Sequence, residues 1–99
     1  MPLLFDWDPA KAASNLVKHG VAFDEAMTVF RDPLALSVLD PDSADEERWI
    51  TLGSAATGNL LLVVHTWADI GRHRTVVRII SARRPTRNEA QRYREEPPT

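Results

Sequence analysis

The stretches LLLVVHTW (Leu60–Trp67) and TVVRIISA (Thr75–Ala82) decide the fold of this chain. The first is rich in leucine and valine and the second in valine and isoleucine, and β-branched residues in particular favour an extended backbone. Two shorter apolar segments, Leu34–Leu39 and Arg48–Gly53, come before them, and short polar links separate all four. Closely spaced runs of this kind are typical of antiparallel strands. The pattern therefore predicts a four-stranded antiparallel sheet, with Ala68–Arg72 as a turn before the last strand.

Two helices are expected before the sheet. Asp8 is suited to cap the first helix, Pro9 fits its first turn, and Gly20 is placed for a left-handed C-terminal cap. A second helix is expected from about Phe23 to Arg31, because its apolar residues recur at helical spacing.

One more helix is expected after the sheet. Thr86 and Glu89 form a capping-box pattern, and the helix that they start should end near Arg94. The predicted order is ααββββα, an α+β fold in which the helices cover one face of the sheet. We expect a single domain over residues 1–94 and a disordered tail over residues 95–99.

Charge is distributed unevenly along the chain. Of its 12 basic residues, four (Lys11, Lys18, Arg31 and Arg48) precede residue 72 and stand against eleven acidic residues. The other eight are arginines between Arg72 and Arg94, with Glu89 as the single acid in that stretch. Arginine binds phosphate through two parallel hydrogen bonds and stacks on bases, so a one-sided cluster points first to nucleic acid.

Several classes of protein are disfavoured by what the sequence lacks. It contains no cysteine, which excludes disulfides, cysteine-bound zinc and thiol catalysis. His19, His65 and His73 lack the spacing of metal ligands, and there is no glycine-rich phosphate loop or serine elbow motif. No apolar run approaches the ~20 residues of a membrane span, and the N-terminus lacks a signal-peptide pattern. We expect a cytoplasmic protein without cofactor or metal.

The remaining candidates are charged side chains, and each also has an ordinary structural interpretation. Arg78 lies within an apolar strand and could be a solvated arginine or a partner for the acidic loop Asp40–Glu47. His65 also lies within an apolar strand and could be an ordinary half-buried histidine. Lys18 and His19 end the first helix, where cations are favoured. Glu47-Arg48 fits a surface ion pair equally well. A set of Arg, Lys, His and Glu nevertheless suits metal-free RNA cleavage, in which the 2′-hydroxyl of the substrate is the nucleophile.

The sequence resembles the BrnT toxin family. The resemblance covers the segment Phe5–Ala26 with its W-x-P-x-K-x-x-x-N-x-x-K-H-G-V pattern, then Glu47-Arg48 with Gly53, and Arg78–Arg84 with Glu89 and Tyr93. It implies a ribonuclease toxin of a type II toxin–antitoxin system with a RelE/ParE-like fold. It also implies a small DNA-binding antitoxin, BrnA, which blocks the toxin in a heterotetramer or larger complex and reaches operator DNA. The family-like positions are Lys11, Asn15, Lys18, His19, Glu47, Arg48, Arg78, Ser81, Arg83 and Glu89.

From these residues we assign candidate roles in RNA cleavage. Arg48, Arg78 and Arg83 would bind phosphate and stabilise charge, and Lys18 would be a further cation. Proton transfer would fall to a member of the group His65, His19 and Glu47. The alternative function is a non-catalytic binding module, or a toxin with a non-RNA target, that docks antitoxin or nucleic acid through its arginine-rich face.

The sequence departs from the family pattern in two places. Ala22 stands where a serine or threonine would cap the second helix, which should cost about 1 kcal/mol at most. The Trp67–Arg74 hairpin is also longer than the short charged turn that is common there.

Overall fold

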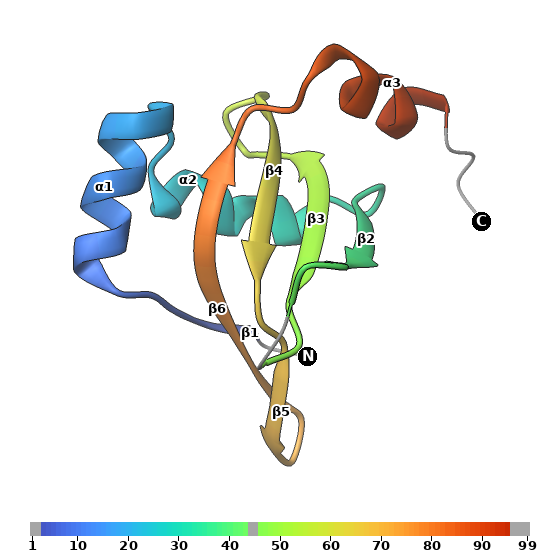
Figure 1. Ribbon diagram of the computed structural model, residues 1–99. Helices are drawn as coiled ribbons and strands as arrows, with labels where there is room; N and C mark the ends of the chain where they lie inside the picture. Colours follow the sequence, from blue (N-terminus) through green and yellow to red (C-terminus); the bar gives the residue numbers. More distant parts are fainter. Residues whose placement is uncertain (1–2, 44–45, 96–99) are drawn as a thin grey trace.

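The computed structural model describes residues 3–43 and 46–95 (Figure 1). Its elements follow in the order β1 (Leu3–Asp6), α1 (Pro9–His19), α2 (Phe23–Met27), the 3₁₀ helix η1 (Thr28–Arg31), β2 (Leu36–Leu39), β3 (Trp49–Ser54), β4 (Leu60–His65), β5 (Ala68–Gly71), β6 (Arg74–Arg83) and α3 (Arg87–Glu95). Within the described residues, no helix is both long enough and apolar enough to cross a membrane. The predicted tail at 95–99 lies outside the described residues except for Glu95, which ends α3.

The sheet is mixed and has six strands among the described residues, so the predicted four-stranded antiparallel sheet and the order ααββββα are wrong. Its strands lie in the order β1-β6-β4-β3-β2, and β5 also pairs with β6. The four expected strands are present as β2, β3, β4 and β6, each antiparallel to the next. The sequence prediction missed β1 and β5.

Both missed strands depend on pairing with β6. β1 runs parallel to the first half of β6, with Leu3 opposite Thr75 and Asp6 opposite Arg78. A four-residue strand paired with the far end of the chain leaves no local signal. Ala68–Gly71, which was expected to be a turn, forms β5 although alanine, aspartate and glycine are poor strand formers. β6 begins before the residues that pair with β4, and this first part of β6 forms an antiparallel hairpin with β5.

The helix boundaries follow the local signals closely. Asp8 Oδ1 accepts a hydrogen bond from the Ala10 N–H at 2.9 Å, and Gly20, at φ 70°, donates to the Leu16 carbonyl at 2.9 Å. Ala22 makes no capping hydrogen bond to α2, because its methyl side chain cannot accept one. The single helix expected over residues 23–31 is instead divided into α2 and the tighter η1.

The core lies between one sheet face and the helices α2 and η1 (Figure 1). Its buried residues come from both layers: Val21, Phe23, Ala26 and Val29 from the helical segment, and Leu61, Val63, Ile79 and Ala82 from the strands. α3 does not join this layer; it lies at the end of the sheet, and its residues Glu89 and Arg92 border the opposite face. The expectation that all helices cover one face is therefore wrong for α3.

Asn15 fastens α1 to β6 where β6 has no neighbouring strand on that side. β1 ends opposite Arg78, so Ala82, further along β6, is without a β1 partner. The buried Asn15 amide accepts from the Ala82 N–H at 3.1 Å and donates to the Ala82 carbonyl at 2.8 Å. It also donates to the Val21 carbonyl at 3.0 Å. The side chain thus acts as a one-residue strand partner.

Asp32 connects η1, β3 and α3 at the end of the sheet where α3 lies. Its carboxylate accepts from the backbone N–H groups of Leu34 and Ser54 and from the Tyr93 hydroxyl. η1 comes so close to β3 that a Cβ on Gly53 would lie 2.8 Å from Val29 Cγ1, which explains glycine at this position. Burial beside Asp32 raises the pKa of Tyr93 to about 12, so its hydroxyl remains a donor.

Candidate functional site

The second face of the sheet carries no helical layer and is largely apolar. Residues directly opposite each other on neighbouring strands point to the same side. Leu61, Val63 and His65 face the core, so the alternate positions define the open face. Its central residues are Leu36, Val38, Ile50, Leu52, Leu62 and Val64.

Arg48 and Arg78 lie in one row across the open face. Trp49, His65 and Ile79 are partners on β3, β4 and β6. The next row of the sheet consists of Arg48, which precedes Trp49, Thr66, which follows His65, and Arg78, which precedes Ile79. The Thr66 N–H donates to the Arg78 carbonyl at 2.9 Å, which extends the ladder to this row. Two strand spacings separate the arginines, about 10 Å between their Cα atoms.

The two arginines of this row differ in their surroundings. Arg48 is held by the acidic loop: its Nη2 lies 3.6 Å from Asp40 Oδ2 and 3.4 Å from the Asp42 carbonyl. Arg78 is exposed and, within the described residues, has no ion-pair partner. Among the described residues, the acidic loop contacts Arg48 and not Arg78. Arg78 is thus the more available cation, and Glu47 is exposed directly before Arg48.

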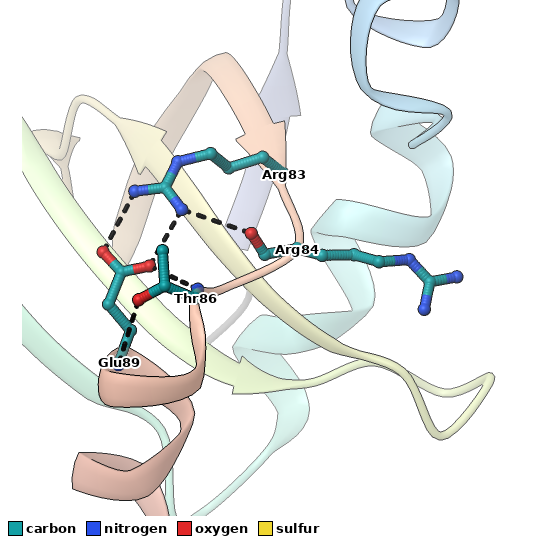
Figure 2. Close-up of polar contacts among 4 residues, drawn as sticks. All are labelled: Arg83, Arg84, Thr86 and Glu89. Atoms are coloured by element: carbon teal, nitrogen blue, oxygen red, sulfur yellow. Dashed lines mark hydrogen bonds and ion pairs between the residues drawn. The ribbon is translucent and has the colours of Figure 1, made fainter.

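Arg83 occupies the other end of the open face and is paired with Glu89 (Figure 2). Nη1 and Nη2 of Arg83 donate to the two Glu89 oxygens at 2.8 and 3.0 Å, and Nη1 also donates to the Arg84 carbonyl at 3.2 Å. Glu89 completes the predicted capping box, since it accepts from the Thr86 N–H while the Thr86 hydroxyl accepts from the Glu89 N–H. The Arg83 guanidinium, above all, lowers the pKa of Glu89 to about 2.

The candidate arginines therefore form two groups. Arg83 is opposite Leu62 on β4, whereas Arg78 shares a row with Thr66. Four residues of strand separate these rows, about 13 Å.

Between β2, β3, β4 and α3 lies a groove of about 350 Å³. It is lined by Leu36, Ser37, Val38, Ile50, Leu52, Leu62, Arg83, Glu89 and Arg92.

His65 lies in the core rather than on the open face. It is 2% exposed and packs edge-on against Phe30, with ring centroids 4.7 Å apart. Its Nδ1 donates to the Thr66 carbonyl at 2.9 Å, which leaves Nε2 to accept from the Thr51 hydroxyl at 2.6 Å. Burial, only partly offset by the Thr66 carbonyl, lowers the pKa of His65. Both ring nitrogens are thus hydrogen-bonded, and the lowered pKa favours the uncharged ring.

Lys18 and His19 lie in the last turn of α1, immediately before the Gly20 cap. Figure 1 shows this end of α1 beside the C-terminal end of β6, and the bonds from Asn15 to Ala82 agree. They are therefore well removed from the row of Arg48 and Arg78. Ser81, by contrast, is on the open face opposite Val64.

Sequence reasoning did not identify Asp32, Asp40 or Arg92 as parts of this region. Asp32 and Asp40 lie in loops, and their contacts depend on how β3 and α3 are placed. Arg92 belonged to the arginine cluster but was not distinguished from its neighbours. Its helical position, three residues after Glu89, is the signal that would have placed both on one side of α3.

Comparison with known proteins agrees with the resemblance found in the sequence. Residues 7–89 match the family described as "Ribonuclease toxin, BrnT, of type II toxin-antitoxin system". No curated protein matches the chain. Among solved structures, the fold is similar to the crystal structure of the Brucella abortus ribonuclease toxin BrnT, with a TM-score of 0.57 and 20% sequence identity. That match covers 88% of this chain and 100% of the Brucella chain.

Proposed function

This chain belongs to the BrnT family of ribonuclease toxins of type II toxin–antitoxin systems, and from that premise we propose that it is an endoribonuclease that cleaves RNA without a metal ion. The row of Arg48, Thr66 and Arg78 carries this proposal. Two guanidinium groups project from neighbouring parts of one sheet face, and Arg78 is exposed. Such a pair can hold the non-bridging oxygens of one phosphodiester.

The proposed reaction uses the substrate's own nucleophile. The 2′-oxygen attacks the adjacent phosphorus, the bond from phosphorus to the 5′-oxygen breaks, and a 2′,3′-cyclic phosphate and a 5′-hydroxyl result. A base takes the proton of the 2′-hydroxyl and an acid supplies one to the 5′-oxygen. Arg48 and Arg78 stabilise the extra negative charge of the transition state, which is where fixed cations contribute most.

Among the candidate proton carriers, Glu47 fits this row best. It is exposed and directly precedes Arg48, whereas both ring nitrogens of His65 are hydrogen-bonded in the core. His19 and Lys18, at the end of α1, are better suited to contact the RNA strand away from the cleaved bond. Arg83 would add a phosphate contact through donors that its pair with Glu89 leaves unused.

The antitoxin partner is also part of the proposal. We infer that a BrnA-type, DNA-binding antitoxin inhibits this chain in a heterotetramer or larger complex, and that operator DNA is reached through the antitoxin. The exposed Arg78, in one row with Arg48 on the open face, supports this, because an acidic protein surface that covers the two arginines would exclude the RNA phosphates.

The test is cleavage of a labelled, protein-free RNA by the purified chain in EDTA. Wild-type protein should give 2′,3′-cyclic phosphate ends, and Arg78→Ala and Arg48→Ala should each reduce the rate about 100-fold or more. Arg31→Ala is the matched control, since Arg31 is exposed on η1 and remote from the open face. Intact RNA with well-folded wild-type protein would instead favour a ribosome-dependent enzyme, a non-RNA target or a non-catalytic binding module.

A further inference from the structure

The groove between the open sheet face and α3 has an apolar floor. Its floor consists of aliphatic side chains from β2, β3 and β4, including Leu52 and Leu62, which are each 7% exposed. β2 is an edge strand of the sheet, and its Val38, at the groove, is 53% exposed. Solvent-facing apolar surface with a defined hollow is typical of a site that another molecule covers.

The rim of this groove is cationic. α3 contributes Arg92, which has no carboxylate within ion-pair distance among the described residues. Arg83 also borders the groove, but Glu89 already neutralises it through two hydrogen bonds. The unmatched charge at the rim is therefore positive and lies on Arg92, next to aliphatic surface.

These features favour a protein segment over RNA as the occupant. RNA bases stack on aromatic rings or on arginine planes. No aromatic residue lines the groove within the described part of the chain, and its aliphatic floor offers neither kind of platform. Leucine, valine and isoleucine surfaces are instead buried against apolar side chains. A partner that also carries carboxylates would meet Arg92 at the rim.

We propose that this groove is the docking site of the antitoxin, and that the segment which fills it is amphipathic and acidic: its apolar side chains enter between β2, β3 and α3, and a carboxylate pairs with Arg92. This inference rests on the proposed antitoxin partner. The groove lies at the Arg83 end of the open face, so a segment seated here and extending along the strands would also cover the row of Arg48 and Arg78.

The test compares charge-introducing variants inside and outside the groove. Val38→Glu and Arg92→Glu place a carboxylate where the partner's apolar and acidic groups would lie. Val17→Glu, on a residue of α1 that is 90% exposed, and Arg31→Glu, on η1, are the matched controls. Affinity for the purified cognate antitoxin is measured by calorimetry, RNA cleavage by the free toxin is measured in parallel, and circular dichroism verifies folding.

Each groove variant should weaken antitoxin binding about tenfold or more, while the controls stay within about twofold of wild type. RNA cleavage by the free variants should be unchanged. Arg92→Lys should bind nearly as wild type, because it keeps the charge. In addition, a photo-crosslinking residue at Val38 should attach to an antitoxin segment in which apolar residues alternate with Asp or Glu.

Three results would overturn the inference. Wild-type affinity in both groove variants would place the antitoxin elsewhere. Retained antitoxin binding with lost cleavage would make the groove an RNA subsite. A crosslinked segment without carboxylates would refute the stated chemistry. Failure of the proposed function gives different results. If the wild-type toxin binds the antitoxin but does not cleave RNA, the proposed nuclease activity is wrong. If it cleaves RNA but does not bind the antitoxin, the proposed partner and this inference are both wrong.

Discussion

Arg83 and Glu89 face each other through two nearly parallel hydrogen bonds of 2.8 and 3.0 Å, which connect the last residue of β6 to the first turn of α3. The same carboxylate accepts from the Thr86 N–H at 2.8 Å. One side chain therefore caps a helix, fixes that helix to the sheet and neutralises an arginine of the candidate site. Each of these roles has a measurable consequence.

Glu89→Gln should increase the affinity of the folded protein for RNA. The amide removes the negative charge beside Arg83 and leaves the guanidinium to pair with phosphate. We expect the dissociation constant to fall a few-fold and stability to fall by about 1 kcal/mol, because both side chains are partly exposed. Fluorescence polarisation with a short non-cleavable RNA gives the affinity. Glu95→Gln, on the same helix, is the control, and equal affinities in wild type and Glu89→Gln would exclude Arg83 from the RNA contact.

Acid should destabilise the wild-type protein through Glu89. Its pKa is lowered from 4.5 to about 2, with the hydrogen bonds from Arg83 as the largest cause. A depressed folded-state pKa contributes stability that is present above pH 4.5 and is lost as the pH falls toward 2. Melting temperatures across this range should therefore fall more steeply for wild type than for Glu89→Gln. Parallel curves for the two proteins would show that the pair does not stabilise the fold.

His65→Gln should reduce stability without abolishing cleavage. Substitution disturbs the hydrogen bonds to Thr51 and Thr66 inside the core, which should cost about 2 kcal/mol. The imidazole is 2% exposed, so it does not reach a phosphate on the open face. Cleavage rates at a temperature where the variant is fully folded provide the test. If the folded His65→Gln protein lacked activity, His65 would again be a candidate for proton transfer.

The His65 pKa, which burial lowers from 6.5, predicts a second signature. Because the folded state disfavours the imidazolium, stability is fully present above pH 6.5 and declines as the pH falls through the folded-state pKa. Wild type should lose stability between neutral and mildly acidic pH, and His65→Gln should lack this loss.

Asn15→Asp should be strongly destabilising. The carboxylate still accepts from the Ala82 N–H, but it faces the carbonyls of Ala82 and Val21 with no proton to donate. Unpaired acceptors and a buried charge should together cost about 3 kcal/mol or more. Urea unfolding measures the difference, with Ser14→Asp on the exposed side of α1 as the control. Equal costs at the two positions would mean that Asn15 does not complete the edge of β6.

The sequence by itself determined the elements that depend on neighbouring residues. The Asp8 and Gly20 caps, the Thr86–Glu89 capping box and the four apolar strands are all encoded within a few positions, because capping and strand propensity are local. The division between acidic first part and arginine-rich second part was also visible, and with the family pattern it led to a ribonuclease toxin.

Tertiary structure alone decided which of the candidate residues meet. The register of β3, β4 and β6 brings Arg48 and Arg78 into one row, although 30 positions separate them in the chain. It also turns His65 into the core, because a strand directs successive side chains to opposite faces. The pairing of β1 with β6, the position of α3 at the end of the sheet and the groove that it borders all arise from contacts between distant segments. Local patterns carry no information about such contacts, since their energy comes from surfaces that only the folded chain brings together.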